Sequence, residues 1–435
     1  MGIMSLIKNR IKTIINHSAE TEFLKGEINR LRNEKRILAN ETIDLMLRYK
    51  KEHGEKVKVV FICHRPAIWG SLKSVYESMK KDDVFDVSII AIPNKKQLPG
   101  SGLAHEIYES EGAEEFFAPM GCMNGYDYET GEWLDPRVLS PDYVFIQTPY
   151  NIAHSRYYQS DVISTYAKIA YIAYFPVINL DEVYDECFPL DFAADLSFYF
   201  SQIEEEDVHA REWIGSSDGS LCQVICTGYP RYDQIMDYLG SNCDIWNSME
   251  SFKILWNTRW TTNEGNCNFF RYKDRFVELL KSDSSLELTY RPHPQAFSEW
   301  LSTGEMTQKE LSEFIALFQN SNMHLDQSDD YNPLLFSSDC LITDRSSLIA
   351  DYICTLKPII YCKGTGGHFM LLESLMDAVY IVDDWDGLTG RLTELRNGID
   401  PLKDKRIHLL KELYHVGDLK VGEKIKDIIK EDSTK

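Results

Sequence analysis

The sequence lacks the features that mark secreted, membrane-spanning and metal-binding proteins. Its ten cysteines form no CxxC pair, and no paired His or Cys set accompanies the closest two, Cys222 and Cys226. We therefore expect free thiols in a reducing cytoplasm, with no metal site and no cofactor. An apolar run of the roughly 18 residues that a membrane span needs is also missing, and the N-terminus has no signal-peptide core.

Positive charge is scarce as well. The chain has 46 Lys and Arg against 68 Asp and Glu, which gives a formal net charge of −22. A general nucleic-acid binder gains its affinity by neutralising phosphates, so this balance excludes nucleic acid as a partner. It does not exclude an anionic small molecule, because a local pocket can be positive inside an acidic protein.

The apolar content, in contrast, is ample: 435 residues at 43% hydrophobic are enough for two cores. From Val57 onward, short apolar strands alternate with helical segments, a pattern typical of βαβ units and parallel sheets. We expect two doubly wound, Rossmann-like domains over residues 53–205 and 206–385, followed by C-terminal helices over 386–435. A helix at 71–81, a helix near 104–112 and a strand at 114–118 are also predicted.

Residues 1–52 stand apart from the rest of the chain as a helical extension. Met4, Ile7 and Ile11 share one face with basic residues around them, and a second pattern runs from Leu24 to Leu45 through Ile28, Leu31 and Leu38. Three interpretations stay open: a coiled coil that makes a homo-oligomer, an amphipathic helix on an anionic membrane surface, or a helix packed on the body.

Polar or glycine-rich segments follow four predicted strands of the second half, at the point where each strand ends. They are Arg259, Arg291–His293, Thr343–Ser347 and the segment 364–367. Ligands of open α/β sheets bind outside the carboxyl ends of the strands. The strand-to-helix turn at Ser346 and Ser347 suits a phosphate, although simple helix capping is the alternative.

These segments resemble the CDP-glycerol glycerophosphotransferases, which prime and polymerise poly(glycerol phosphate) in teichoic acids and related capsules. The resemblance rests on Gly-Tyr-Pro-Arg-Tyr-Asp at 228–233, Arg-Pro-His-Pro at 291–294, Asp-Tyr-Asn-Pro-Leu-Leu at 330–335, and Asp-Cys-Leu-Ile-Thr-Asp-Arg-Ser-Ser at 339–347 followed by Lys-Pro-Ile-Ile-Tyr. It covers roughly residues 220–365. It implies a GT-B fold with the CDP-alcohol donor in the C-terminal domain and the acceptor in the N-terminal domain.

The resemblance implies transfer of glycerol phosphate from CDP-glycerol to a hydroxyl of a surface glycan or lipid-linked acceptor, with release of CMP. The reaction would take place in the cytoplasm or at the inner face of the membrane. The alternatives are a GT-B glycosyltransferase, a CDP-ribitol-type transferase and a catalytically degenerate relative.

Each conspicuous residue then acquires an expected role. His293, held between two prolines, would donate to the pyrophosphate, and Arg259 and Arg291 would neutralise phosphate unless they pair with acidic side chains. The hydroxyls of Thr343, Ser346 and Ser347 would donate to the β-phosphate. Asp344 would hold the loop or a donor hydroxyl, and Gly364 would let backbone approach the cytidine unless it only shapes the loop.

The identity of the general base stays open. In the family the base is the histidine of a His-Gly-Thr-Pro-Leu-Lys segment, and this segment is absent here. The corresponding strand end reads Ala173-Tyr174-Phe175-Pro176. His64, at the end of the first strand, is the first candidate, since an imidazole titrates near neutrality. His154 is the second candidate and His368 the third.

Overall fold

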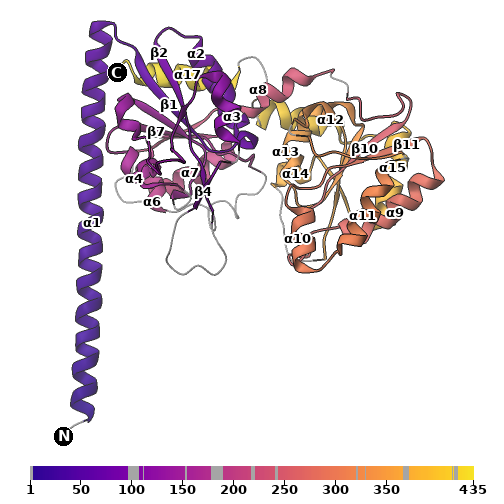
Figure 1. Ribbon diagram of the computed structural model, residues 1–435, viewed down its shortest axis with the longest axis horizontal. Coiled ribbons are helices and arrows are strands. Elements are labelled where there is room, and N and C mark those ends of the chain that lie inside the picture. The colour runs from indigo at the N-terminus through magenta and orange to yellow at the C-terminus, as the bar shows by residue number, and fades with distance from the viewer. Residues whose placement is uncertain are drawn as a thin grey trace.

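The computed structural model describes residues 3–96, 107–110, 112–151, 154–177, 190–216, 221–240, 243–319, 322–328, 330–365, 372–413, 415 and 420–435. Two α/β domains lie side by side, and a 51-residue helix, α1 (Ile3–His53), runs along the first domain and projects beyond it (Figure 1). The expected pair of doubly wound domains with an N-terminal helical extension is therefore confirmed.

The first domain is built on a parallel sheet of seven strands. Their order is β5 (Met123–Asn124), β2 (Phe85–Ala91), β1 (Val57–Cys63), β6 (Tyr143–Ile146), β7 (Lys168–Tyr171), β8 (Phe198–Ser201) and β9 (Gln223–Cys226). Its central strands are rich in β-branched and aromatic residues and are buried on both faces, as expected of a sheet covered by helices on each side.

Two layers of helices cover this sheet, and a separate apolar cluster lies on each of its faces. One layer contains α2 (Gly70–Lys80), α3 (Ala113–Phe117), α17 (Val421–Asp432) and the C-terminal half of α1. The other contains α4 (Ser160–Ile163), α6 (Leu190–Asp195) and α7 (Glu204–Gly215). The predicted helix at 71–81 thus forms as α2.

The second domain repeats the plan with six parallel strands. Their order is β12 (Met323–Leu325), β11 (Leu286–Tyr290), β10 (Phe252–Trp256), β13 (Cys340–Thr343), β14 (Ile359–Cys362) and β15 (Tyr380–Val382). One face is covered by α9 (Phe269–Ser282), α10 (Ala296–Thr303), α11 (Gln308–Ala316) and α15 (Trp385–Arg396). The other is covered by α8 (Arg231–Ile235), α12 (Asn332–Ser337), α13 (Leu348–Tyr352), α14 (Glu373–Met376) and the segment after α16 (Lys403–His408).

Strand pairing corrects two of the expected domain limits. The predicted boundary at 205/206 would assign β9 to the second domain, but β9 pairs with β8 and completes the first sheet. The C-terminal stretch 386–435 is not a unit either: α15 packs on the second sheet, whereas α17 returns to the first domain through Val421, Ile425 and Ile429 (Figure 1). The chain therefore crosses between the domains twice.

The prediction for 104–118 is also wrong where the structure describes it. Residues 97–106 and 111 lie outside the described part, but β4 (Ile107–Glu109) pairs with β3 (Asn94–Lys96) as an antiparallel ribbon where a helix was expected. The predicted strand at 114–118 is instead the short helix α3. Its buried side chains, Ala113 and Phe117, lie four residues apart, which is the spacing of a helical face.

Candidate active site

Three neighbouring strands of the second sheet bring the conspicuous segments together. The order β11-β10-β13 places the ends of these strands side by side, with Arg291 and His293 after β11, Arg259 after β10, and Asp344 to Ser347 after β13. Because the strands are parallel, all of these segments leave the same edge of the sheet. The expected convergence of these segments is therefore present.

His293 presents a neutral imidazole at this edge. Its ring stacks on Trp260 with centroids 5.6 Å apart, and its Nδ1 accepts a hydrogen bond from the backbone N–H of Gln295 at 3.2 Å. Desolvation by the surrounding protein and the nearby charge of Arg259 lower the pKa of His293 to about 4. With Nδ1 acting as acceptor, the proton lies on Nε2, so the ring is a neutral hydrogen-bond donor at pH 7.

This protonation state can be measured directly. We expect the ring carbon-bound proton resonances of His293, assigned through His293→Asn, to stay constant between pH 5.5 and 8 in NMR spectra. The sign follows from the lowered pKa, which keeps the neutral form until the pH falls toward 4. A midpoint near 6.5, the ordinary value for a histidine, would contradict the proposed donor state.

Arg259 and Arg345 share one carboxylate, that of Glu264. Arg259 Nη2 lies 2.8 Å from Glu264 Oε1, and Arg345 Nη1 lies 2.8 Å from Oε2. Partial burial alone would raise the pKa of Glu264, but hydrogen bonds from Arg259 and Thr261 and the two guanidinium charges outweigh it and lower the pKa. Two cations around one anion leave one net positive charge, which suits a phosphate group.

Asp344 and Thr343 hold the strand ends together. The Asp344 carboxylate accepts from the backbone N–H groups of Arg259, at 2.5 Å, and Asn268, at 2.8 Å, and only 1% of the residue is exposed. Burial raises the pKa of Asp344 to about 7, against the opposing effect of these hydrogen bonds. Thr343 is also 1% exposed. Asp344 therefore supports the loop, which is one of the two roles expected of it. The expected donation from the Thr343 hydroxyl to the β-phosphate stays a prediction.

Ser346 and Ser347 lie at the surface of the turn that precedes α13. Ser346 Oγ accepts from the backbone N–H of Leu348 at 3.2 Å, so it caps this turn, while the Ser347 side chain is exposed. Only five residues of α13 are α-helical before a 3₁₀ turn follows. The helix dipole is correspondingly small, and anion binding here would depend on hydroxyl and backbone N–H groups.

Gly364 packs against the loop after β10. A Cβ atom at this position would lie 2.3 Å from the Gly265 carbonyl oxygen and 2.7 Å from the Asn266 Cα. Next to it, the Thr365 N–H donates to the same carbonyl at 2.8 Å. The absence of a side chain at Gly364 therefore permits contact between two loops. This matches the alternative role given above, in which Gly364 shapes the loop. Residues 366–371, including His368, lie outside the described part of the chain.

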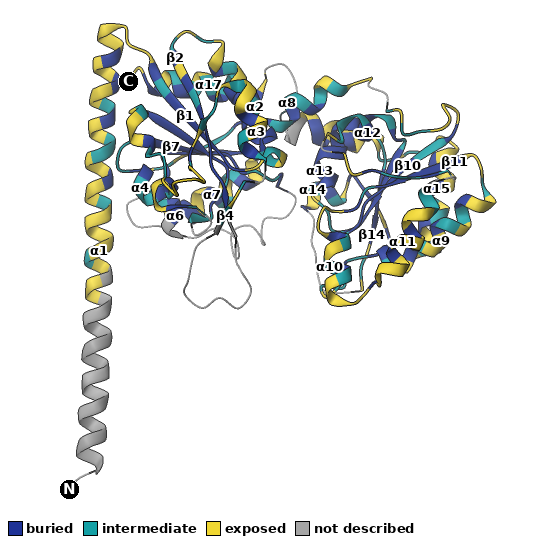
Figure 2. Ribbon diagram, in the orientation of Figure 1, coloured by how far each residue is buried: buried dark blue, intermediate teal, exposed yellow. Residues whose placement is uncertain are grey.

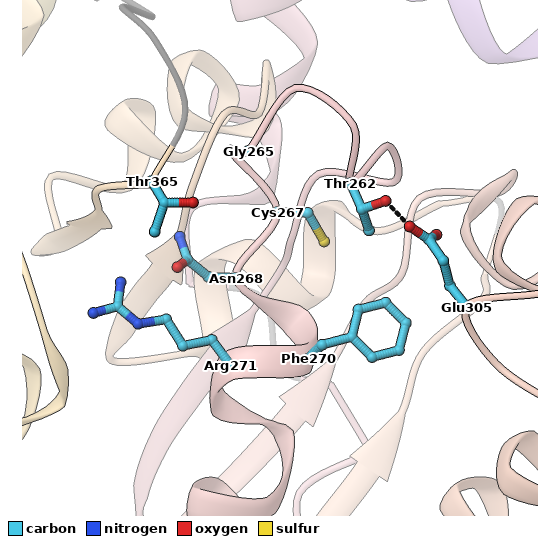
Figure 3. A pocket seen from close by; sticks show the side chains of 8 residues that line it. All are labelled: Thr262, Gly265, Cys267, Asn268, Phe270, Arg271, Glu305 and Thr365. Atoms are coloured by element: carbon cyan, nitrogen blue, oxygen red, sulfur yellow. Dashed lines mark hydrogen bonds between the residues drawn. The ribbon is translucent and has the colours of Figure 1, made fainter. Parts of the chain in front are cut away.

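The two loops form one wall of a cavity of about 410 Å³ (Figure 3). Arg271 and Asn268 extend from the start of α9, Thr365 lies across from them, and Thr262 donates to Glu305 at the far side. The lining residues are Thr262, Gly265, Cys267, Asn268, Phe270, Arg271, Glu305 and Thr365.

Gly364→Ala is expected to destabilise the protein by about 1–3 kcal/mol, because backbone atoms must move to admit the methyl group. Chemical unfolding would measure the change. Gly390→Ala is the matched control: the site lies inside α15 and has no atom within 4 Å of the added Cβ. Alanine there should stabilise the helix by about 0.5–1 kcal/mol. Equal effects at the two sites would contradict the packing role of Gly364.

Arg291 is paired with an acidic side chain, which was the alternative to neutralising phosphate. Its guanidinium bonds Asp326 and donates to the Ser328 carbonyl at 3.0 Å, and it also lies 4.4 Å from the centroid of the Tyr331 ring. Arg231 lies 5.3 Å from the same centroid. Tyr331 therefore connects the segment at 291–294 with the segment at 228–233.

Arg231 ties α8 to α13 and contacts the first domain. Its Nε donates to the Asp351 carboxylate at 2.9 and 3.0 Å, and its Nη2 donates to the Tyr331 hydroxyl at 2.6 Å. Its side chain also packs on Gly70 at the start of α2, and Gln234 Nε2 donates to the Gly70 carbonyl at 2.8 Å. The loop after β1, which begins at His64, therefore reaches the second domain through this network.

Two of the three candidate bases lie together in the first domain. The rings of His64 and His154 have centroids 5.2 Å apart, and His154 Nε2 is 2.9 Å from Thr148 Oγ1. Burial, with the neighbouring His154 and Arg65 adding to it, lowers the pKa of His64 well below its ordinary value, and burial lowers that of His154 to about 4. Among the described residues, the buried His154 Nδ1 has no hydrogen-bond partner. Both rings are therefore neutral at pH 7 and able to accept a proton.

Sequence reasoning missed three residues that shape the site. Glu264, Asn268 and Asp351 each face a residue far away in the chain, and none belongs to a periodic pattern or to a motif that carried the resemblance. The nearest signal for Glu264 was its spacing of five residues from Arg259 within a loop.

Comparison with known proteins gives a family match over part of the chain. Residues 217–364 match the family model described as CDP-Glycerol:Poly(glycerophosphate) glycerophosphotransferase. No curated protein sequence is a significant match to the chain.

Solved structures with the same two-domain architecture include the wall teichoic acid polymerase TagF. Its TM-score is 0.53 at 16% identity, with 97% of this chain and 98% of that chain covered. A UDP-GlcNAc 2-epimerase from Neisseria meningitidis, bound to UDP-GlcNAc, has a TM-score of 0.55 at 13% identity, with 87% and 99% covered. The epimerase from Methanocaldococcus jannaschii gives 0.52 at 15%, with 86% and 99% covered.

The two parallel sheets, each covered by helices, give the chain a two-domain fold of the GT-B type. The family match is confined to residues 217–364, so this part of the chain is similar to the CDP-glycerol glycerophosphotransferase family.

Proposed function

We propose that the protein transfers glycerol phosphate from CDP-glycerol to a hydroxyl group of a surface glycan or lipid-linked acceptor, and releases CMP. The observation that carries the proposal is the convergence at three adjacent strand ends of a neutral imidazole donor, a positively charged Arg–Glu–Arg group and surface serines. Such a set suits the pyrophosphate of a nucleotide-activated donor.

The proposed step is an in-line displacement at the phosphorus that carries glycerol. The acceptor oxygen forms a new P–O bond, the bond between this phosphorus and the bridging oxygen breaks, and CMP leaves with the electron pair. His293 Nε2–H and the Arg259–Glu264–Arg345 group would stabilise charge on the phosphoryl oxygens. The acceptor proton would pass to His64 or His154, whose lowered pKa values keep both rings deprotonated.

The proposed location is the cytoplasm or the inner face of the membrane. All nine cysteines in the described part of the chain are free thiols, which suits a reducing compartment. None of the described helices is long and apolar enough to cross a membrane. Docking through the basic cluster at residues 4–15 stays a prediction, since the side chains before Phe23 lie outside the description.

Donor identity is tested by thermal unfolding with CDP-glycerol, CDP-ribitol, CMP and UDP-GlcNAc in parallel. A ligand that binds only the native state at 100 times its Kd stabilises it by about 2.7 kcal/mol. We expect CDP-glycerol to raise the melting temperature more than the other three. A larger shift with UDP-GlcNAc would favour a glycosyltransferase, and a larger shift with CDP-ribitol a ribitol phosphate transferase. Binding of CDP-glycerol without turnover would indicate a degenerate relative.

A further inference from the structure

The long helix α1 carries two separate apolar stripes, and only one of them is covered. The covered stripe contains Ile43 and Leu47, which are 6% and 3% exposed and belong to the core of the first domain. Lys50 fixes the same side of the helix through a buried ion pair with Asp142 at 2.6 Å. This side of α1 is therefore committed to the body of the protein.

The second stripe lies on the other side of the helix, and Figure 2 shows the described part of α1 mostly exposed. Its members are between 49% and 63% exposed: Leu24, Ile28, Leu31, Leu38, Leu45 and Tyr49. The four leucines recur every seven residues, so they occupy d positions of a heptad, and Ile28 and Tyr49 occupy a positions. In the same register, Ile43, Leu47 and Lys50 fall on b and f, about 150° around the helix from the a/d seam. The stripe thus faces away from the body.

We propose that α1 pairs through this stripe with α1 of a second copy, as a parallel two-stranded coiled coil. The proposal is independent of the donor and acceptor, since none of these residues belongs to the candidate active site. Leucine at d with isoleucine at a is the combination that favours two strands, and Lys35 at an a position limits the choice of register and oligomer.

The flanking charges determine the orientation. Three consecutive g positions are glutamates: Glu27, Glu34 and Glu41. An antiparallel pair would set these glutamates against one another. A parallel pair sets each against the following e position of its partner, and these are Arg32, Ala39 and Met46, none of them acidic. Charge complementarity therefore selects the parallel dimer.

The same charges argue against a lipid surface as the occupant of this stripe. Helices that bind anionic membranes carry Lys and Arg along the edges of the apolar face. Here one edge of the stripe, formed by the g positions, is acidic. Arg30 forms ion pairs within α1 with Glu27, at 2.5 Å, and with Glu34. A carboxylate has lone pairs for further donors, so these contacts leave the g positions able to meet a partner helix.

Light scattering on the size-fractionated full-length protein tests the proposal. We expect twice the mass of one chain for the wild type. Leu31→Glu with Leu38→Glu should raise the dimer dissociation constant by more than about 100-fold, because two buried leucines per helix are lost. The matched control is Phe23→Glu with Ile37→Glu, which replaces two exposed apolar residues at c positions, 71% and 39% exposed, and should leave the dimer intact. Circular dichroism confirms that each variant is folded.

Orientation is tested by oxidising Leu24→Cys and Leu45→Cys separately, with wild type as the control for the native thiols. A parallel coiled coil links each variant to its own copy. An antiparallel one links neither variant alone but links a mixture of the two.

Four results would overturn the proposal: a monomeric wild type, a dimer that persists in the Leu31/Leu38 variant, an antiparallel linkage pattern, or a monomer that binds phosphatidylglycerol vesicles through Leu31 and Leu38.

Discussion

His293→Ala is expected to lower kcat for CMP release by about 100- to 1000-fold while the protein stays folded. The imidazole is locked by stacking on Trp260 and by the Gln295 N–H, so its Nε2–H is oriented before substrate arrives. Removing one such preorganised donor from a site of developing negative charge costs this much in other enzymes. The measurement is steady-state CMP release at saturating CDP-glycerol.

Two variants separate a chemical role of His293 from a structural one. His293→Gln places an amide N–H donor the same number of bonds from Cα as the imidazole Nε2, and it should recover part of the rate. His408→Ala removes an exposed histidine of α16 and should leave the rate unchanged. If folded His293→Ala released CMP at the wild-type rate, the proposed pyrophosphate contact would be wrong.

Asp351→Ala is expected to cause the largest loss of stability, about 3–5 kcal/mol, because it leaves the Arg231 charge buried without its carboxylate. The side chains are 15% and 6% exposed, and Arg231 also bonds Tyr331, which in turn donates to Asp351 at 2.6 Å. Chemical unfolding followed by tryptophan fluorescence measures the change. KM for CDP-glycerol should rise as well, since Tyr331 supports Arg291.

The control for this prediction is an ion pair at the surface. Glu313→Ala breaks the exposed pair with Lys309, 3.7 Å long, and should change the free energy of unfolding by less than about 1 kcal/mol. The double variant Arg231→Met with Asp351→Leu should be more stable than Asp351→Ala, because no unpaired charge remains buried. A loss below about 1 kcal/mol for Asp351→Ala would show that the pair does not stabilise the fold.

The sheets could be predicted from the sequence because their strands are buried on both faces and appear as continuous apolar runs. The prediction of a strand at 114–118 was wrong, because the buried residues of this segment, Ala113 and Phe117, have the spacing of a helical face. The predicted domain boundary at 205/206 was wrong for another reason. The sequence of β9 identifies a strand but not the sheet to which it belongs, and only its pairing with β8 assigns it to the first sheet.

The candidate site was predicted in outline. The polar segments that follow the strands predicted one common edge of the sheet for His293, Arg259, Ser346 and Ser347. The structure places them there, because adjacent parallel strands end at the same edge. The loop-holding role of Asp344 was one of the two roles expected of it, but the contacts that produce this role were not predictable. Asp344 is a loop support because two backbone N–H groups from distant segments converge on it, and nothing in the local sequence indicates either contact.

The most direct test of the proposed function is the fate of the donor phosphorus. Purified protein is incubated with CDP-glycerol and a membrane extract of the native cells as acceptor, and the reaction is followed by ³¹P NMR, with CDP-ribitol and UDP-GlcNAc in parallel. We expect the diphosphate resonances of CDP-glycerol to disappear as CMP and a new phosphodiester resonance grow in equal amounts. Unchanged CDP-glycerol, together with consumption of UDP-GlcNAc, would contradict glycerol phosphate transfer.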